Sequence, residues 1–248
     1  MSKDITAELI TALYGRSSVF MGSMETPTER IVYHLVYETI RAGQTVIWVC
    51  LRDTPNTIFA KFSSYELHLA GLEERLWFVD STILGDSAIA PQTSRCTSLD
   101  YACIIMEVGH LLKKYPKSLV MFDNIGILAA LDRVEAIVRP LKYMDTIIRA
   151  EGGGFVTMLT SKAIQGSVET ELLGTIDVII RVEEDKIHAL VGNKELSIPY
   201  CFSGSELILG SADIDNDLRE LFSLTLEEKK KLELEVEEKA LLYGKRVD

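Results

Sequence analysis

The alternation of apolar and polar positions divides the chain into short apolar runs separated by amphipathic segments. The runs at 45–51 (TVIWVCL) and 118–123 (SLVMFD) are almost wholly apolar, which is typical of strands buried on both faces of a parallel sheet. Between such runs, apolar residues recur at helical spacing, and Gly43 and the glycines at 152–154 are natural helix stops. The predicted strands are 17–22, 45–51, 76–80, 118–123, 155–161 and 176–182, and the predicted helices are 4–14, 27–42, 54–71, 99–115 and 132–150.

The pattern changes after the last of these strands. Two alternating runs, 186–191 and 195–202, are joined by Gly192-Asn193 and predict a β-hairpin, and 205–210 adds a further edge segment. The stretches 81–98 and 162–171 are polar and are expected to be loops. Alternating strands and helices followed by an antiparallel run indicate an α/β domain with a mostly parallel central sheet.

Residues 212–248 differ in composition from the rest of the chain. Thr225 and Glu228 have capping-box spacing ahead of a charged helix with a thin apolar stripe. Two interpretations stay open: a solvated helix leaning on the core, or a helix for partner docking or self-association. The sequence therefore predicts a domain over 1–211 and an acidic helical tail over 212–248.

Charge and composition narrow the function classes. The chain has 248 residues, 47% of them hydrophobic, and a formal net charge of −11. An acidic surface repels phosphate backbones and anionic lipids, so nucleic-acid and membrane partners are disfavoured. No apolar run approaches a bilayer span and the N-terminus lacks a secretory pattern, so a cytoplasmic protein is expected. The four cysteines form no CxxC pair and are interpreted as reduced structural thiols.

The turn between the first strand and the first long helix lies where a nucleotide-binding protein keeps its phosphate loop. A working loop reads GxxxxGK[ST], and the matching residues at 22–29 are GSMETPTE. Gly22 is retained, but Pro27 stands at the second glycine, Thr28 at the lysine and Glu29 at the magnesium-binding hydroxyl. A donor, a cation and a metal ligand are thus missing, and a negative charge is added.

The same residues also suit a self-capped helix. Thr26 is a good N-cap, Pro27 suits the first helical position, and Glu29 would complete a capping box. The alternative is a remnant nucleotide pocket. The candidate residues of that pocket are Gly22, Ser23, Thr26, Thr28, Glu29, Asp53 and Asp123.

Two further strand ends carry charged residues. Asp123 follows an apolar strand, as a magnesium-orienting carboxylate would, although an Asp that caps the next turn has the same pattern. Arg52-Asp53 follows the second strand, where an α/β ATPase can hold the base that activates water, yet only one of the two is acidic. The four histidines share no ligand spacing, so no metal site is predicted, apart from Asp123 if Mg²⁺ binds.

Together these segments resemble the KaiC-like branch of the RecA-type P-loop ATPases, the single-domain kind common in archaea. The segment 19–58 resembles the family's phosphate-loop strand, helix and second strand, 118–124 (SLVMFDN) its Walker B strand, and 155–161 (FVTMLTS) its sensor strand. Residues 176–191 and 198–209 are similar to its closing strands and terminal hairpin. The resemblance covers about 1–211 and implies a three-layer αβα architecture.

The departures from the family pattern fall on functional positions. Besides the altered phosphate loop, the family's catalytic glutamate pair is matched by Arg52 and Asp53, and its Lys-x-Arg by Gly192-Asn193-Lys194. Because phosphoryl transfer depends on these groups, no catalytic residue and no cofactor are expected. The resemblance implies a non-catalytic pseudo-ATPase acting as a regulatory or scaffolding subunit, with a protein partner or a homo-oligomer. The alternative is an atypical ATP-binding protein that uses ATP and Mg²⁺ and signals or hydrolyses weakly.

Overall fold

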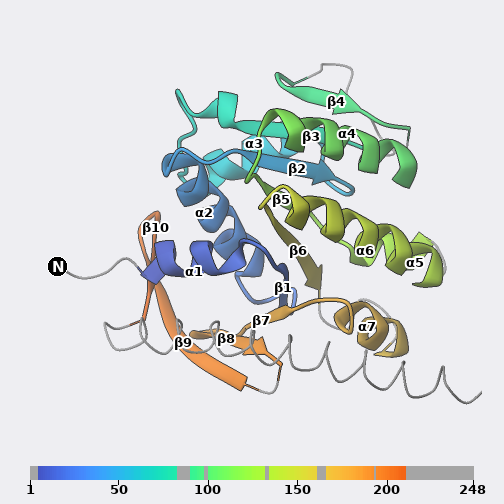
Figure 1. Cartoon of the computed structure of the whole chain (residues 1–248). Helices are drawn as coiled ribbons and strands as arrows, with labels where there is room; N and C mark the ends of the chain where they lie inside the picture. The colour runs from blue at the N-terminus through green and yellow to red at the C-terminus, as the bar shows by residue number, and fades with distance from the viewer. Residues whose placement is uncertain are drawn as a thin grey trace, which may run out of the picture.

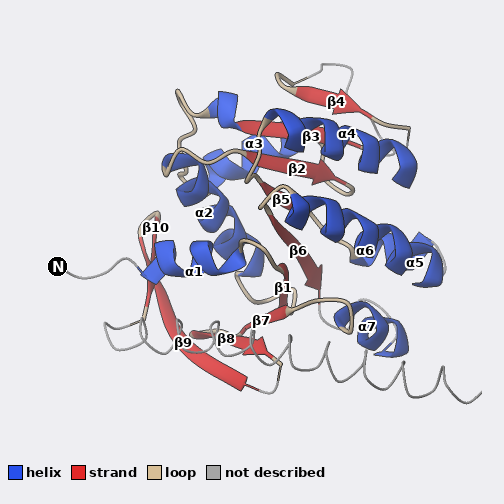
Figure 2. Cartoon of the chain, in the orientation of Figure 1, coloured by secondary structure: helices blue, strands red, loops and turns tan. Residues whose placement is uncertain are grey.

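The computed structural model describes residues 5–82, 90–97, 100–131, 134–160, 166–192 and 194–210, and of 129–131, 134–136 and 167 it describes the backbone alone. Helices surround a central sheet in this part of the chain (Figures 1 and 2). The predictions for the tail at 212–248, including Thr225 and Glu228, concern residues outside the described ranges and stay predictions. None of the described helices is long and apolar enough to cross a bilayer.

The described strands form a ten-stranded sheet in the order β10-β9-β8-β7-β1-β6-β5-β2-β3-β4. The seven strands from β1 to β7 run parallel to one another, and β8, β9 and β10 continue the sheet beyond β7 in antiparallel pairing. The predicted α/β class, mostly parallel sheet and terminal hairpin are therefore confirmed. The strands are β1 (Ser17–Gly22), β2 (Val46–Cys50), β3 (Leu76–Asp80), β4 (Thr93–Arg95), β5 (Leu119–Phe122), β6 (Gly154–Thr160), β7 (Val178–Val182), β8 (Lys186–Val191), β9 (Lys194–Ser203) and β10 (Glu206–Leu209).

Helices cover both faces of the sheet, so the arrangement is compatible with three layers (Figure 1). Residues of α1, α2 and α3 pack on one face, and residues of α4, α5, α6 and α7 pack on the other. The helices are α1 (Ile5–Leu13), α2 (Thr28–Arg41), α3 (Pro55–Ser64), α4 (Tyr101–Lys114), α5 (Gly126–Leu131), α6 (Val134–Ala150) and α7 (Gly166–Leu173), with a 3₁₀ turn at Glu73–Arg75.

The two faces are filled by alternate residues of the same strands. Every residue of β2 is buried; Trp48 packs in the core beneath α2 and α3, whereas Ile47 and Val49 pack beneath the helices of the other face. Such burial on both sides explains why the run reads as continuously apolar. Trp48 also contacts Tyr33 of α2, with ring centroids 5.0 Å apart.

The structure departs from the predicted boundaries at four places. α3 ends at Ser64 instead of continuing to residue 71, because Glu66 adopts a left-handed backbone with φ of 61°. Within the predicted loop 81–98 lies the short strand β4, and within 162–171 lies the start of α7. α5 precedes the predicted helix at 132–150. Short elements of this kind are set by pairing and packing with distant segments, which periodicity does not report.

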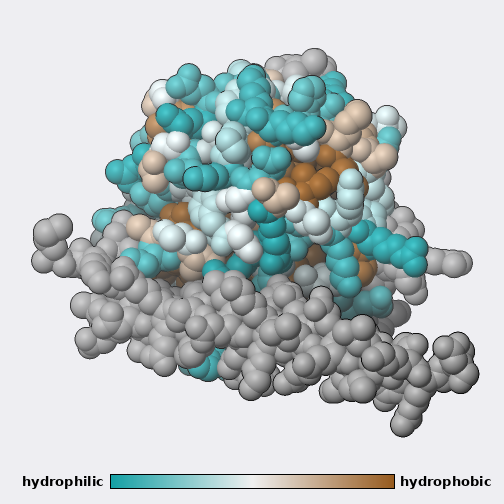
Figure 3. Space-filling model, viewed as in Figure 1, coloured by the Kyte–Doolittle hydropathy of each residue, from teal (hydrophilic) through white to brown (hydrophobic). Residues whose placement is uncertain are grey.

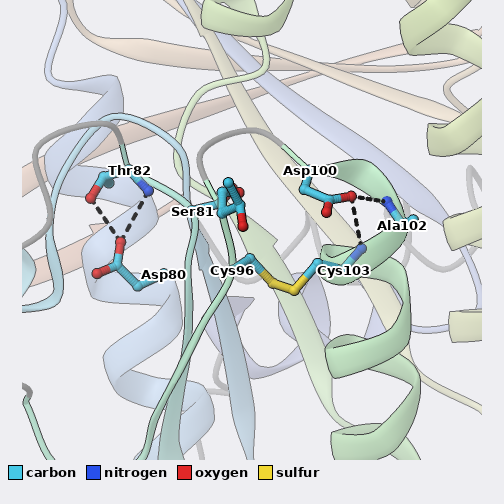
Figure 4. The surroundings of a disulfide bond; sticks show 8 residues. Asp80, Ser81, Thr82, Cys96, Asp100, Ala102 and Cys103 are labelled. Carbon is cyan, nitrogen blue, oxygen red and sulfur yellow. Dashed lines mark hydrogen bonds between the residues drawn. A yellow bond between two sulfur atoms is a disulfide. The ribbon is translucent and has the colours of Figure 1, made fainter.

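Two of the four cysteines are bonded to each other. Cys96 and Cys103 form a disulfide with Cα atoms 5.7 Å apart, whereas Cys50 is buried and unbonded and Cys201 is exposed and unbonded (Figure 4). The sequence-based interpretation of all four as reduced thiols is therefore wrong for this pair. Spacing could not reveal it, because the approach depends on where α4 begins relative to β4.

Candidate functional site

The carboxyl ends of the parallel strands meet at one edge of the sheet. The turn after β1, the segment 51–54 after β2 and the segment 123–125 after β5 all leave from this edge. In α/β sheets, ligands bind outside these strand ends, so this is where a site is expected. All seven candidate residues predicted from the sequence lie here.

The turn between β1 and α2 is held by its own side chains. The Thr26 hydroxyl donates to the Ser23 carbonyl at 2.9 Å and lies 2.9 Å from the Thr28 hydroxyl, and the Glu25 amide donates to the Ser23 hydroxyl at 3.2 Å. α2 begins at Thr28, so the N-cap position belongs to Pro27, which has no polar side chain to cap with. The predicted Thr26–Glu29 capping box is therefore wrong.

Gly22 is enclosed by the two threonine hydroxyls. A Cβ atom on Gly22 would overlap the Oγ1 atoms of both Thr26 and Thr28, so only glycine fits beneath this turn. The requirement is steric, because the φ of Gly22 is not positive. The position that a Gly22 side chain would take is thus occupied by the protein's own hydroxyls.

Glu29 belongs to an ion-pair network with Arg52, Asp53 and Lys61. Its Oε1 lies 2.6 Å from both Arg52 Nη2 and Lys61 Nζ. Asp53 Oδ2 closes the network, 2.6 Å from Arg52 Nη2 and 2.7 Å from Lys61 Nζ. Two carboxylates and two cations therefore compensate each other across α2, the β2–α3 segment and α3. We call these four residues the charge network.

The charge network is partly buried and keeps both carboxyl groups ionised. The Asp53 side chain is 15% exposed and that of Glu29 31%, and burial by itself would raise the pKa of each. For Glu29, the hydrogen bond and charge of Lys61 and a bond from the Tyr65 hydroxyl at 3.0 Å outweigh burial and lower its pKa. For Asp53, hydrogen bonds from Arg52 and Lys61 lower the pKa in the same way.

Asp123 lies beneath the charge network and binds backbone. Its Oδ1 accepts from the Leu51 amide at 3.0 Å, and its Oδ2 accepts from the amides of Arg52 and Asp53, both at 2.8 Å. The residue is 1% exposed, and burial raises its pKa to about 6 although the three backbone bonds oppose the shift. The sequence-based alternative of an Asp that caps the next turn does not describe these bonds, because the amides that Asp123 holds belong to the segment after β2 and not to the turn that follows Asp123.

A cavity of about 590 Å³ borders the β1–α2 turn, and none of the four residues of the charge network lines it. The turn forms one wall, and α7 and the end of β7 form the other. Four carboxylates and one guanidinium line this cavity, so its charge opposes a polyphosphate. The charged lining residues are Glu25, Glu169, Arg181, Glu183 and Glu184.

The predicted residues thus separate into three groups. Gly22, Ser23, Thr26 and Thr28 form the closed turn, Glu29 and Asp53 belong to the charge network, and Asp123 supports the network from below. Sequence reasoning missed Lys61 and Tyr65, which lie one helical turn apart on or just after α3. That spacing predicts that both side chains lie on the same face of the helix, but their approach to Glu29 depends on how α2 and α3 pack. Among the described residues, no group of three or more His, Cys, Asp and Glu side chains could hold a metal ion.

Comparison of the chain with models of known protein families gives no match, and comparison with curated proteins likewise finds no relative. A functional assignment therefore depends on the geometry of the closed turn, the charge network and the buried Asp123.

Proposed function

We propose that this chain is a non-catalytic RecA/KaiC-like protein, a pseudo-ATPase that acts as a regulatory or scaffolding subunit. The observation that carries the proposal is the charge network. By the resemblance, Glu29 stands at the position of the magnesium-binding hydroxyl, and Arg52 and Asp53 stand at the catalytic carboxylates. In this chain Arg52 pairs with both Glu29 and Asp53, and Lys61 pairs with the same two carboxylates.

The pairing of charges within the charge network supports the proposal that no phosphate binds there. The cations of the charge network are both paired with carboxylates at 2.6–2.7 Å, so an entering phosphate would have to compete with Glu29 and Asp53 for them. The Thr26 and Thr28 hydroxyls occupy the place of a Gly22 side chain, and Thr26 bonds to the Ser23 carbonyl, which supports a turn stabilised by its own groups and not by a bound phosphate.

The state of Asp123 argues against a magnesium site. Mg²⁺ needs carboxylate oxygens that can replace water in an octahedral shell. Both oxygens of Asp123 already accept backbone hydrogen bonds, and the side chain is buried beneath the segment that it holds. Binding a metal there would release at least part of the β2–α3 segment.

A regulatory or scaffolding role needs surface for a protein partner. Met24, at the tip of the closed turn, is 93% exposed, and Met106 of α4 and Tyr143 of α6 are 63% and 59% exposed. Apolar surface is also visible between α4 and α6 amid hydrophilic surroundings (Figure 3). Methionine and tyrosine are enriched at protein interfaces, which is consistent with a partner or a second copy binding at these exposed side chains.

The alternative is an ATP-binding protein with an atypical site. Partial exposure of the charge network favours it, since the Arg52 side chain is 38% exposed and could exchange a carboxylate for a phosphate. Thermal melting against Mg-ATP separates the two functions, because a ligand that binds the native state raises the midpoint. We expect an unchanged midpoint, and a saturable rise would favour the alternative.

A further inference from the structure

We propose that Cys96 and Cys103 form a reversible redox site, a dithiol that low-molecular-weight disulfides oxidise to the intramolecular bond. Cys96 follows the edge strand β4, and Cys103 lies in the first turn of α4 (Figure 4). Oxidation therefore ties the edge of the sheet to the start of a covering helix, and reduction releases that tie.

The protein holds both cysteines in place without the disulfide. The Cys96 amide donates to the Asp80 carbonyl at 2.8 Å, and the Phe78 amide donates to the Gln92 carbonyl at 2.9 Å, which keeps β4 on the sheet. Asp100 caps α4 by accepting from the amides of Ala102 and Cys103 at 3.0 and 3.1 Å. Because these bonds do not involve sulfur, the two thiols stay within reach of each other after reduction.

The position of the bond suits a switch better than a permanent staple. Its cysteines are only 7 positions apart, so the closed ring restricts the unfolded chain less than a bond between distant residues would. The large apolar core on both faces of the sheet gives the domain its own stability, unlike the small domains that depend on disulfides. Both cysteines are partly exposed, so oxidant and reductant can reach them.

The surroundings of the other two cysteines, Cys50 and Cys201, restrict disulfide formation within the protein to Cys96 and Cys103. Cys50 is 0% exposed, and burial raises the pKa of its thiol, so little reactive thiolate forms. Cys201 is exposed and unbonded on β9. An oxidant is therefore expected to leave Cys50 alone, to bond Cys96 to Cys103, and to form only a mixed disulfide at Cys201.

The exchange balances as two successive displacements. One thiolate attacks a sulfur of the small disulfide, which forms a protein mixed disulfide and expels one small thiolate. The second cysteine, as thiolate, displaces the other small thiol and closes the Cys96–Cys103 bond. The pair loses two electrons and two protons, and the small disulfide gains them as two thiols.

The test uses the full chain carrying Cys201→Ser, reduced and then exposed to oxidised glutathione, with intact-mass measurement. We expect a product lighter by two hydrogen atoms, without a glutathione adduct, that dithiothreitol returns to the starting mass. Adding Cys96→Ser or Cys103→Ser should instead leave one stable glutathione adduct, because no partner thiol remains to displace it. Hydrogen exchange should also be faster at 93–97 and 101–104 in the reduced protein.

Three outcomes would overturn the proposal. A stable adduct on the Cys201→Ser protein would show that the two cysteines do not reach each other. A lack of reaction in the native protein would show that the site is closed to oxidants. A bond that resists excess dithiothreitol in the folded state would identify a permanent structural disulfide. Since this test involves no nucleotide, its result is independent of the proposed pseudo-ATPase role.

Discussion

Lys61 Nζ lies 2.6 Å from Glu29 Oε1, which joins α3 to the first turn of α2 between residues 32 positions apart. The same ammonium also contacts Asp53, so it bridges two carboxylates that would otherwise repel each other. This bridge allows two acidic side chains to lie close together at the start of α2 and after β2. The charge network can therefore be tested through Lys61.

Replacing Lys61 by methionine should destabilise the protein by about 1 kcal/mol, because Glu29 and Asp53 then share only Arg52 and partial exposure screens the loss. Urea unfolding at pH 7 measures the effect, and a double-mutant cycle with Glu29→Gln isolates the pair. Glu38→Gln, which breaks the more exposed pair with Arg41, is the matched control and should cost less. If Lys61→Met and Glu38→Gln lower the free energy of unfolding equally, the charge network contributes no more stability than an ordinary surface pair.

Gly22→Ala should destabilise the protein by about 1–3 kcal/mol, because the new methyl group overlaps the hydroxyls of Thr26 and Thr28. The triple variant with Thr26→Ala and Thr28→Ala should lose less stability than the sum of the losses of the three single variants, because the hydroxyls that the new methyl group overlaps are then absent. Gly109→Ala is the control: no atom lies near its added methyl group in α4, and it should stabilise by about 0.5–1 kcal/mol. If Gly22→Ala leaves the free energy of unfolding unchanged in thermal or urea unfolding, the turn has room for the added methyl group.

Asp123→Asn should destabilise the protein by about 1–3 kcal/mol at pH 7, since an amide cannot accept all three backbone bonds. The pKa of Asp123 is about 6 in the fold and near 3.9 in an unfolded chain. Its protonation therefore stabilises the fold fully below about pH 4, and this contribution is lost as the pH rises through 6.

The stability difference between wild type and Asp123→Asn should accordingly grow as the pH falls from 7 to 4. Urea unfolding across this range measures it, with Asp100→Asn as the control, because Asn caps a helix about as well as Asp. A difference that stays constant with pH would contradict the raised pKa of Asp123.

Under the proposed function, the triple change Pro27→Gly, Thr28→Lys and Glu29→Thr should create nucleotide affinity, because it supplies a backbone donor and a cation and frees Arg52 and Lys61 from one carboxylate. Binding of a fluorescent ATP analogue with Mg²⁺ measures the gain relative to wild type. Glu29→Thr alone is the control for the loss of negative charge. If the triple variant binds no better than wild type, the closed turn or Asp123 blocks the pocket independently of these three residues.

Much of the fold was predictable because its signals are local. The apolar runs of β1, β2, β3 and β5 and the helical spacing in α2 and α4 follow from burial on the sheet, so the sequence indicated them within a few residues. The turn after Gly22 could also be located, because a strand and a helix flank it. Whether that turn was open or filled could not be decided, since it depends on where the Thr26 and Thr28 hydroxyls point.

The sequence by itself determined the α/β class and the order of the main elements, and it located the turn after Gly22, because these depend on periodicity and residue identity along the chain. Only the tertiary structure brought Lys61 and Tyr65 to Glu29, turned Asp123 toward three backbone amides and placed Cys96 beside Cys103. These contacts arise from the crossing of separate helices and strands. Their geometry is set by packing between distant segments, and a linear pattern of side chains does not contain it.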